Sequence, residues 1–284
     1  MNTTREATKG TDWGTRALFA MCDGFALLRL TGFRPKRRFA IDIGGWRVET
    51  VDTPRQLLEV LQLRSEVFLS EVSDAGAGTQ RLDTDVYDLF ADHVIVREPQ
   101  NGRVAAAYRL LCSTDTSRFY SQEEFELDGF LAQPGIKLEL GRACVRSEYR
   151  NGHSLGLVWK GLGRYARLTG ARYLFGCSTV WSSDPRLAYG IVESLKPERH
   201  SDAFGVRPKE RYSFAERPPR LQPLDAAASR AQLPPLLRSY LNAGALVHGE
   251  PAYDWKFRCA DLFTVIDLQN THPRVAARFL GSES

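Results

Sequence analysis

The sequence predicts a mixed α/β fold in which one central sheet is flanked by helices. Three observations predict it: apolar residues recur at helical spacing in capped segments, shorter apolar runs bounded by turn residues are typical of strands, and the two kinds of segment alternate. The expected order is helix, hairpin, strand, helix, strand, helix and strand, which is the layout of a layered α/β domain.

The first predicted helix covers residues 54–70. Thr53 is a suitable N-cap, Pro54 suits the first helical position, and Gln56 stands at the capping-box position. Apolar residues then follow at helical spacing as far as Phe68. Further helices are expected at 121–124, where Ser121 opens a second capping-box pattern, and at 154–168, 186–195 and 234–242.

Five segments are predicted to be strands. Residues 93–97 and 103–111 are joined by the turn Pro99-Gln100-Asn101-Gly102, so they are expected to form a hairpin. The segment 136–145 alternates in polarity, and 173–180 is apolar enough to be buried. The last strand is expected at 262–268.

The composition is that of an ordinary globular protein, with 43% hydrophobic and 25% charged residues. The most apolar stretch, residues 17–33, contains Asp23 and Arg29 and is too short for a membrane span. It also lacks the small-residue cleavage site of a secretory signal. The five cysteines are odd in number and form no C-x-x-C pair, which favours free thiols in a reducing compartment over disulfides or a zinc site. We therefore expect a cytoplasmic protein without a bound metal.

Residues 1–45 are expected to form a basic, partly apolar arm on a domain of residues 46–284. Residues 1–40 hold eight Lys or Arg against three acidic residues, so the rest of the chain is close to neutral. Such an arm could lie peripherally on the anionic inner face of a membrane, or it could be solvated and packed loosely on the domain. Nucleic acid is not an expected partner, because no recognition motif accompanies the charge.

The segment 138–145 carries the charges of greatest chemical interest. Glu139 and Arg142 would face opposite sides of a regular strand, but a bulge near Gly141 would bring them to one side. A carboxylate is costly to bury alone, so Glu139 is either part of a structural ion pair or a general base whose pKa is raised by burial. An amine needs such a base, since an attacking ammonium must first lose a proton.

A strand–loop–helix junction follows this strand directly. Arg150, Gly152, His153 and Ser154 stand at the start of the predicted helix, where exposed backbone N–H groups bind anions. Arg and Gly at this point suit the phosphate of a phosphopantetheine arm. The chain has no G-x-G-x-x-G, P-loop or G-x-S-x-G motif.

At these residues the sequence resembles the ornithine-acyl carrier protein N-acyltransferases and their hemolysin-like relatives in the GNAT superfamily. The resemblance covers residues 46–280 in consistent order. It is carried by Arg64-Ser65-Glu66-Val67-Phe68, Ala91-Asp92-His93, 102–111 (GRVAAAYRLL), 119–127 (FYSQEEFEL), 138–150 (LELGRACVRSEYR), 173–177 (YLFGC), 233–244 and 249–268. It implies a GNAT-like single domain, a mixed central sheet flanked by helices, with residues 1–45 outside it.

A more distant resemblance is to the acyl-homoserine-lactone synthases. Their pattern of R-x-x-x-F, D-x-x-D, R-L-L and E-x-x-R appears here as Arg64 with Phe68, Asp85 with Asp88, Arg109, and Glu139 with Arg142. The resemblance implies that Glu139 is the catalytic base, acting directly or through water. It also implies an ion-pair network of the arginines and aspartates that shapes the acyl and acceptor pockets. The tryptophan expected between the first two elements is missing, which argues against a lactone product.

The resemblance implies acyl carrier protein as the acyl donor and no permanently bound cofactor. The loop 150–155 departs from the Q/R-x-x-G-x-G/A pattern that cradles the pyrophosphate of coenzyme A, because His153 and Leu155 replace small residues. A carrier protein presents a single phosphodiester, which needs less of this loop. Acyl carrier protein is acidic, so the candidates for its docking face are Arg146, Arg150, Lys160, Arg164 and Arg167; the last three could equally be a solvated helix face.

Direct acyl transfer is the expected mechanism. The thioester would lie between the strands 136–145 and 172–180, with its carbonyl polarised by the backbone N–H groups of Cys144 and Val145. The acceptor's α-amine, deprotonated by Glu139, would attack this carbonyl. Arg109 or Arg142 would hold the acceptor's carboxylate.

Ornithine is the favoured acceptor, which makes the reaction the first step of ornithine-lipid synthesis. Its side-chain ammonium would need an acidic partner, for which Asp85, Asp88, Asp92 and Glu124 are unranked candidates. Three alternatives stay open: the same reaction on glycine or another amino acid, synthesis of a homoserine-lactone signal, and a non-catalytic module that binds lipid or acyl carrier protein.

Overall fold

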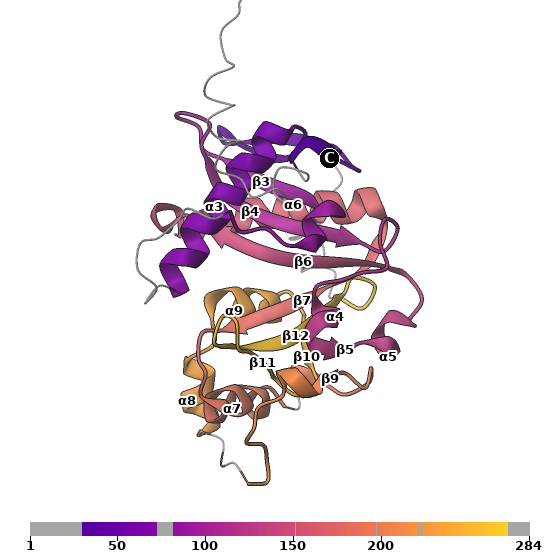
Figure 1. The fold of residues 1–284 in the computed structure, drawn as a ribbon, viewed down its shortest axis with the longest axis vertical. Helices are drawn as coiled ribbons and strands as arrows, with labels where there is room; N and C mark the ends of the chain where they lie inside the picture. The colour runs from indigo at the N-terminus through magenta and orange to yellow at the C-terminus, as the bar shows by residue number, and fades with distance from the viewer. Residues whose placement is uncertain are drawn as a thin grey trace, which may run out of the picture.

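One sheet runs through the molecule from end to end (Figure 1). The structure is a computed structural model that describes residues 30–72, 82–150, 152–196, 198–220, 222 and 224–271. Within these residues ten strands form the sheet, in the order β1 (Ala40–Ile43), β2 (Trp46–Thr50), β3 (Asp92–Arg97), β4 (Val104–Cys112), β6 (Ile136–Val145), β7 (Ala171–Val180), β12 (Cys259–Asp267), β10 (Leu246–His248) and β8 (His200–Ser201), with β11 (Ala252–Asp254) beside β12. Neighbours are antiparallel except for β6 with β7 and β10 with β8, so the predicted mixed sheet is confirmed.

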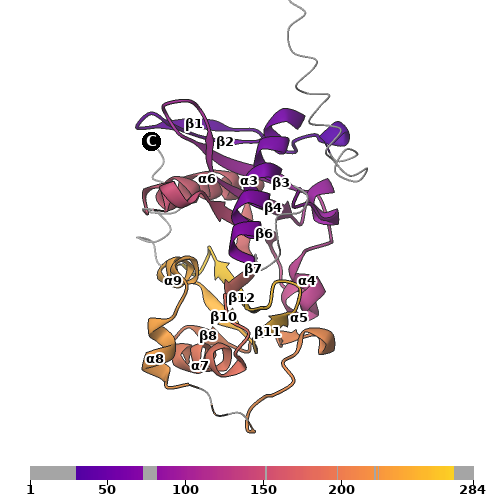
Figure 2. The same cartoon turned by 60° about the vertical axis from the view of Figure 1, so that its left-hand side comes forward.

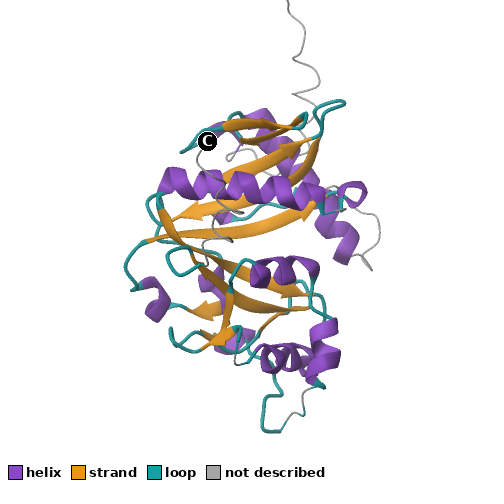
Figure 3. Ribbon diagram, turned by 180° about the vertical axis from the view of Figure 1, so that it is seen from behind, coloured by secondary structure: helices purple, strands orange, loops and turns teal. Residues whose placement is uncertain are grey.

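Helices cover both faces of the sheet, because its strands are apolar on both sides. On one face α3 (Pro54–Val72) packs through Leu57 in an apolar cluster with Ala107 of β4. On the other face α6 (His153–Thr169) packs through Leu162 in a cluster with Ala106. Figures 2 and 3 show these two helices on opposite sides of the upper strands. The other half of the sheet carries α7 (Pro185–Leu195), α8 (Ala226–Ala231) and α9 (Pro235–Asn242).

The remaining elements are short. They are η1 (Val86–Leu89), α4 (Ser121–Glu124), β5 (Phe125–Glu126), α5 (Asp128–Leu131), η2 (Ser147–Tyr149), β9 (Arg207–Pro208) and η3 (Glu210–Tyr212). β5 and β9 pair with each other, apart from the main sheet. The start of α4 lies over β6, since the backbone of Ser121 contacts Glu139 of that strand.

The two halves of the sheet part where β6 and β7 diverge. The strands pair in parallel only from Ile136–Glu139 against Ala171–Phe175, although each continues for several residues. Gly176 follows directly, and a Cβ atom placed on it would overlap the carbonyl oxygen of Leu140. The strands therefore touch backbone to backbone at this point and separate beyond it.

The predicted bulge in β6 is confirmed and lies one residue beyond Gly141. Ala107 pairs with Cys144 and Arg109 pairs with Gly141, so two residues of β6 lie opposite one of β4. Arg142 takes the left-handed φ of 48° that this bulge requires. Its guanidinium lies over the ring of Tyr120, whose backbone N–H donates to Glu139, so the two charged residues share a face.

Most predicted elements are confirmed with small shifts of their ends, and one cap is wrong. Gln56 and Thr53 form the predicted capping box, with Gln56 N–H donating to Thr53 Oγ1 at 3.3 Å. The helix at 121–124 exists, but its N-cap is Tyr120, and Ser121 does not cap it. Ser121 is the first residue inside the helix, and its hydroxyl donates to Glu139.

The described part of the predicted arm belongs to the domain. Leu30 and Phe33 are buried under α3, and β1 pairs with β2 across Gly44 and Gly45, so the folded region begins before residue 46. Residues 1–29, on which the predicted membrane contact rests, lie outside the described residues. Within the described ranges, no helix has the length and apolar character needed to cross a membrane.

Candidate active site

Three arginines and three aspartates form a buried ion-pair network between α3 and the sheet. They are Arg64 of α3, Arg109 of β4, Arg142 of β6, and Asp83, Asp85 and Asp88 around the start of η1. Arg64 donates to Asp83 at 2.8 Å and to Asp88 at 2.7 Å. Arg109 donates to Asp85 at 2.5 Å and to Asp88 at 3.3 Å. Arg142 donates to Asp85 at 2.9 Å and lies 3.4 Å from Asp83, so the predicted network exists and contains one aspartate more than predicted.

The three positive and three negative charges of this network balance, and they keep one another ionised. Burial opposes ionisation of Asp83 and Asp88, but the arginine charges outweigh it and hold the pKa of both carboxyls below the usual range. The aspartates in turn raise the pKa of Arg64 against the effect of burial. Burial lowers the pKa of the adjacent His93 to about 3, so this ring is neutral and leaves the charge balance unchanged.

Arg109 differs from the other two arginines in having one unused edge. Its Nη1 serves Asp85 and Asp88, whereas Nε and Nη2 donate to no acceptor among the described residues. These two N–H groups form the fork that binds a carboxylate with two parallel bonds. They face Gly141 of the neighbouring strand, where a Cβ atom would lie 3.8 Å from Nε.

Glu139 is buried, with 2% of its surface exposed, at the last position where β6 pairs with β7. Its Oε1 accepts the backbone N–H and the hydroxyl of Ser121 at 2.7 and 2.6 Å, and its Oε2 accepts the N–H of Tyr120 at 2.7 Å. Burial raises the pKa of this carboxyl, while the hydrogen bonds from Ser121 and Tyr120 and the charge of Arg109 oppose the rise. Oε2 accepts one bond from the described residues and can accept another.

A narrow, mostly apolar pocket opens on the other face of the sheet where β6 and β7 part. It is lined by Leu140, Leu174, Phe175, Gly176, Cys177, Ser178, Tyr240, Thr264 and Ile266. The register of β6 against β4 determines which N–H groups of β6 point toward this opening. The N–H of Arg146 donates to Ala105 of β4, and alternation along the strand then directs the N–H of Cys144 to β4 and that of Val145 away from it.

The start of α6 has features of an anion site. Gly152 has a φ of 80° and provides no side-chain cap to this 17-residue helix, whose first N–H groups have no acceptor within the helix itself. Ser154 is fully buried in the first turn, and its hydroxyl has no partner among the described residues. Arg150 donates to the carbonyl of Val145 at 3.0 Å, and Arg146 bonds to the carbonyl of Val104 and to Glu66.

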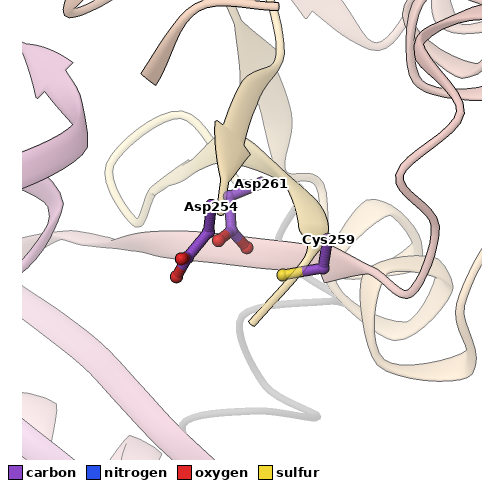
Figure 4. Close-up of side chains that lie close together, drawn as sticks. All are labelled: Asp254, Cys259 and Asp261. Atoms are coloured by element: carbon purple, nitrogen blue, oxygen red, sulfur yellow. The ribbon is translucent and has the colours of Figure 1, made fainter. Parts of the chain in front are cut away.

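A second group of acids lies beside Glu139 on the same face of the sheet. Asp254, Cys259 and Asp261 are buried and place their oxygen and sulfur atoms within 4.8 Å of one another (Figure 4). Glu124 of α4, which is fully buried, is close enough for these aspartates to raise the pKa of its carboxyl together with burial. Two carboxylates and a thiolate can hold a metal ion, and three carboxylates can hold an organic cation.

Comparisons with known proteins identify the family. Residues 63–160 match the acetyltransferase (GNAT) domain family. The chain is 32% identical over 225 residues to the L-ornithine N(alpha)-acyltransferase of Rhodobacter capsulatus, an alignment that covers 73% of this chain and 84% of that protein. The chain belongs to this acyltransferase family.

Two further proteins are similar to this acyltransferase. The L-ornithine N(alpha)-acyltransferase of Brucella abortus is 27% identical over 256 residues, which cover 84% of this chain and 88% of that one. The solved structure of the acyl-homoserine lactone synthase BjaI with MTA is 16% identical with a TM-score of 0.45, and the match covers 81% of this chain and 84% of that one.

The structure of the acyltransferase brings the predicted catalytic and substrate-binding residues together, with the exception of Phe68. Glu139, Arg142 and Arg109 converge through Tyr120, which lies beneath two of the guanidinium groups. Phe68 of α3 is half-buried against the apolar cluster under that helix and is not a member of the ion-pair network.

Sequence analysis missed Asp83, Asp254 and Asp261 in this acyltransferase. Asp83 lies two residues before Asp85 in a polar loop without periodicity, so no pattern distinguishes it. Asp261 lies one residue before the predicted strand 262–268 and is surrounded by apolar residues, and a carboxylate among apolar residues is the signal that singled out Glu139 and that could have found it.

Proposed function

We propose that this acyltransferase moves a (3-hydroxy)fatty acyl group from acyl carrier protein to the α-amine of ornithine, the first step of ornithine-lipid synthesis. The observation that carries the proposal is the family, since four relatives that align with 73–84% of this chain are named L-ornithine N(alpha)-acyltransferase. The buried Glu139 at the divergence of β6 and β7 supports it, because acylation of an amine needs a base beside the acyl carbonyl.

The divergence of β6 and β7 supports binding of the acyl thioester. Beyond Glu139 and Phe175 the strands no longer pair, so the N–H of Val145 is directed to the opening and can polarise the thioester carbonyl. The pairing of β4 with β6 leaves Cys144 unsuited to this role. The apolar lining of the pocket that contains Leu140 and Tyr240 matches the apolar carbons of an acyl chain.

The start of α6 supports a phosphopantetheine donor carried by a protein. The N–H groups at the start of α6 and the buried hydroxyl of Ser154 suit one phosphodiester. His153 is exposed and packs edge-on against Trp46, so a bulky ring stands at this loop. Lys160, Arg164 and Arg167 are exposed along α6 and provide basic charge for an acidic carrier protein.

The chemistry follows from the positions of Glu139, Arg109 and Val145. The Nε and Nη2 edge of Arg109 binds the acceptor's α-carboxylate and so places its α-ammonium beside Glu139. Glu139 takes one proton, the free amine attacks the thioester carbon, and the N–H of Val145 stabilises the oxyanion. The C–S bond then breaks, the amide forms, and the thiol leaves with the second proton of the amine.

A mass-spectrometric assay tests this function. Purified protein is incubated with 3-hydroxyacyl carrier protein and a mixture of amino acids, and we expect one product, Nα-acylornithine. Glu139→Gln should lower kcat by roughly 10²- to 10⁴-fold while binding of the acyl carrier protein persists. Glu126→Gln, at an exposed carboxylate of β5, is the matched control and should act like the wild type.

Two outcomes would contradict the proposal. Formation of another acyl amino acid and no acylornithine would exclude ornithine as the acceptor. Full turnover by the folded Glu139→Gln protein would exclude Glu139 as the base.

A further inference from the structure

The carboxylates of Glu124, Asp254 and Asp261 converge without a matching cation. They belong to α4, β11 and β12, and 0%, 3% and 3% of their surfaces are exposed. No ion pair within the described part of the chain includes any of the three. Arg142, whose charge acts on Asp261, is itself paired with Asp83 and Asp85. This group of acids, the acidic cluster, therefore contrasts with the balanced Arg–Asp network next to it.

The hydrogen bonds to the acidic cluster leave part of it unsatisfied. Asp254 accepts the N–H of Lys256 at 2.8 Å, and Asp261 accepts the hydroxyl of Thr179 at 2.7 Å. Oε1 of Glu124 is buried and has no donor among the described residues. Burial and the charge of Asp254 raise the pKa of Asp261 to about 6, against the hydrogen bonds of Asp261 with Thr179 and Glu124.

The acidic cluster is connected to Glu139 through two side chains. Ser121 donates its hydroxyl to Glu139 at 2.6 Å, and its oxygen lies 3.4 Å from the thiol of Cys177. The same thiol lies 3.7 Å from Oε2 of Glu124. Asp261 pairs with Thr179, which lies two residues after Cys177 on β7. The carboxylate of Asp261 therefore lies on the same face of the sheet as the Cys177 side chain. The base and the acidic cluster are thus adjacent, separated by about the length of a short side chain.

Four acids were predicted from the sequence as candidates to bind the side-chain ammonium of ornithine. Three of them, all except Glu124, already have partners. Asp85 and Asp88 are held by arginines. Asp92 accepts the N–H groups of Lys36 and Arg37 and the hydroxyl of Tyr165. Glu124 is the one of the four that lies in a site of unbalanced negative charge.

We infer that Glu124, Asp254 and Asp261 form the pocket for the side-chain ammonium of the amino-acid acceptor and give the enzyme its preference for a cationic side chain. This inference rests on the proposed function. With the α-amine at Glu139, three methylene groups carry the δ-ammonium of ornithine past Cys177 to Glu124. A primary ammonium has three donors, one for the open oxygen of Glu124 and one for each aspartate.

The experiment compares ornithine with norvaline, which has the same carbon skeleton and lacks the side-chain amine. The wild type should prefer ornithine. Glu124→Gln and Asp261→Asn, which keep the shape of each side chain, should each raise KM for ornithine roughly 10- to 100-fold, since a buried charged hydrogen bond is lost. The kcat/KM for norvaline should stay constant or rise in both variants. Asp267→Asn, further along β12 in a pair with Arg172, is the control and should change neither acceptor.

The remaining outcomes separate the two proposals. If the wild type acylates ornithine and norvaline equally, the pocket is wrong and the proposed function stands. If it acylates neither but acylates glycine, the proposed function fails. Equal losses for both acceptors in the two variants would assign the acidic cluster a structural role. Metal measured at one equivalent in the purified wild type and lost in Asp254→Asn would make the cluster a metal site and overturn the inference.

Discussion

Oε1 of Glu139 accepts two hydrogen bonds from one residue, the backbone N–H of Ser121 at 2.7 Å and its hydroxyl at 2.6 Å. Both bonds favour the ionised carboxylate and oppose the effect of burial. Ser121 therefore controls how readily the proposed base holds a proton.

Ser121→Ala should move the acid limb of the pH profile of kcat/KM to higher pH. The base must be ionised to accept a proton, so activity is lost as the pH falls through the pKa of Glu139. Removing a donor to the carboxylate raises that pKa, and the limb should shift upward by about one unit or less. Ser178→Ala, which alters a buried serine bonded to Thr264 on the other side of β7, should leave the limb in place. An unchanged limb in Ser121→Ala would show that Glu139 does not set it.

Elements that depend on neighbouring residues could be predicted from the sequence. Contacts that depend on the order of the strands in the sheet could not. The capping box at Thr53 and Gln56 needs only neighbouring residues, and it is present. The Gly44-Gly45 turn of the β1–β2 hairpin was also readable, because two residues with positive φ favour a tight hairpin, but the basic charge of the region led to an arm being predicted.

The acidic cluster could not have been assembled from the sequence. Glu124 and Asp261 are distant in the chain and meet because β12 pairs with β7 while α4 covers the same face. No local pattern specifies that β12 returns to the centre of the sheet. The Arg–Asp network was predicted only through a family resemblance, since Arg64 and Arg109 also gave no signal of pairing.

Arg64→Met should destabilise the fold by about 3–5 kcal/mol, because it leaves Asp83 and Asp88 buried without their main counter-charge. Urea unfolding at pH 7 measures this change. Arg172→Met, which breaks a more exposed pair with Asp267, should have little effect. Equal effects of the two changes would show that the buried network contributes no more than a surface pair.

The same network predicts a dependence of stability on pH. The pKa values of Asp83, Asp85 and Asp88 are lowered in the folded protein, so their stabilisation is present above the ordinary pKa of about 4 and is lost as the pH falls below it. Urea midpoints measured from pH 7 to pH 3 should therefore fall steeply below about pH 4. The fall should be shallower in Arg64→Met, whose aspartates lose part of their lowered pKa. A parallel fall in both proteins would assign acid unfolding to other carboxylates.

Gly176→Ala should be destabilising by about 1–3 kcal/mol, because its Cβ would overlap the carbonyl oxygen of Leu140 and push β6 and β7 apart. Gly156→Ala is the matched control, since it lies on the exposed side of α6 with no atom within 4 Å of the new methyl group. It should stabilise the helix by about 0.5–1 kcal/mol. Urea unfolding of both variants distinguishes the close backbone contact at Gly176 from a general effect of replacing glycine. If the free energy of unfolding changes in the same direction and by a similar amount in both variants, the close contact is not the cause.

Arg109→Lys tests the proposed role of the unused guanidinium edge. Lysine keeps a positive charge for Asp85 and Asp88 but cannot present the paired Nε and Nη2 donors. We expect KM for ornithine to rise roughly 10- to 100-fold, as for loss of a charged hydrogen-bond pair, while KM for the acyl carrier protein stays unchanged. Ornithine amide, which has no carboxylate, should react equally well with both proteins. If the amide loses as much as ornithine does, Arg109 acts by holding the network together, and the acceptor's carboxylate must bind elsewhere.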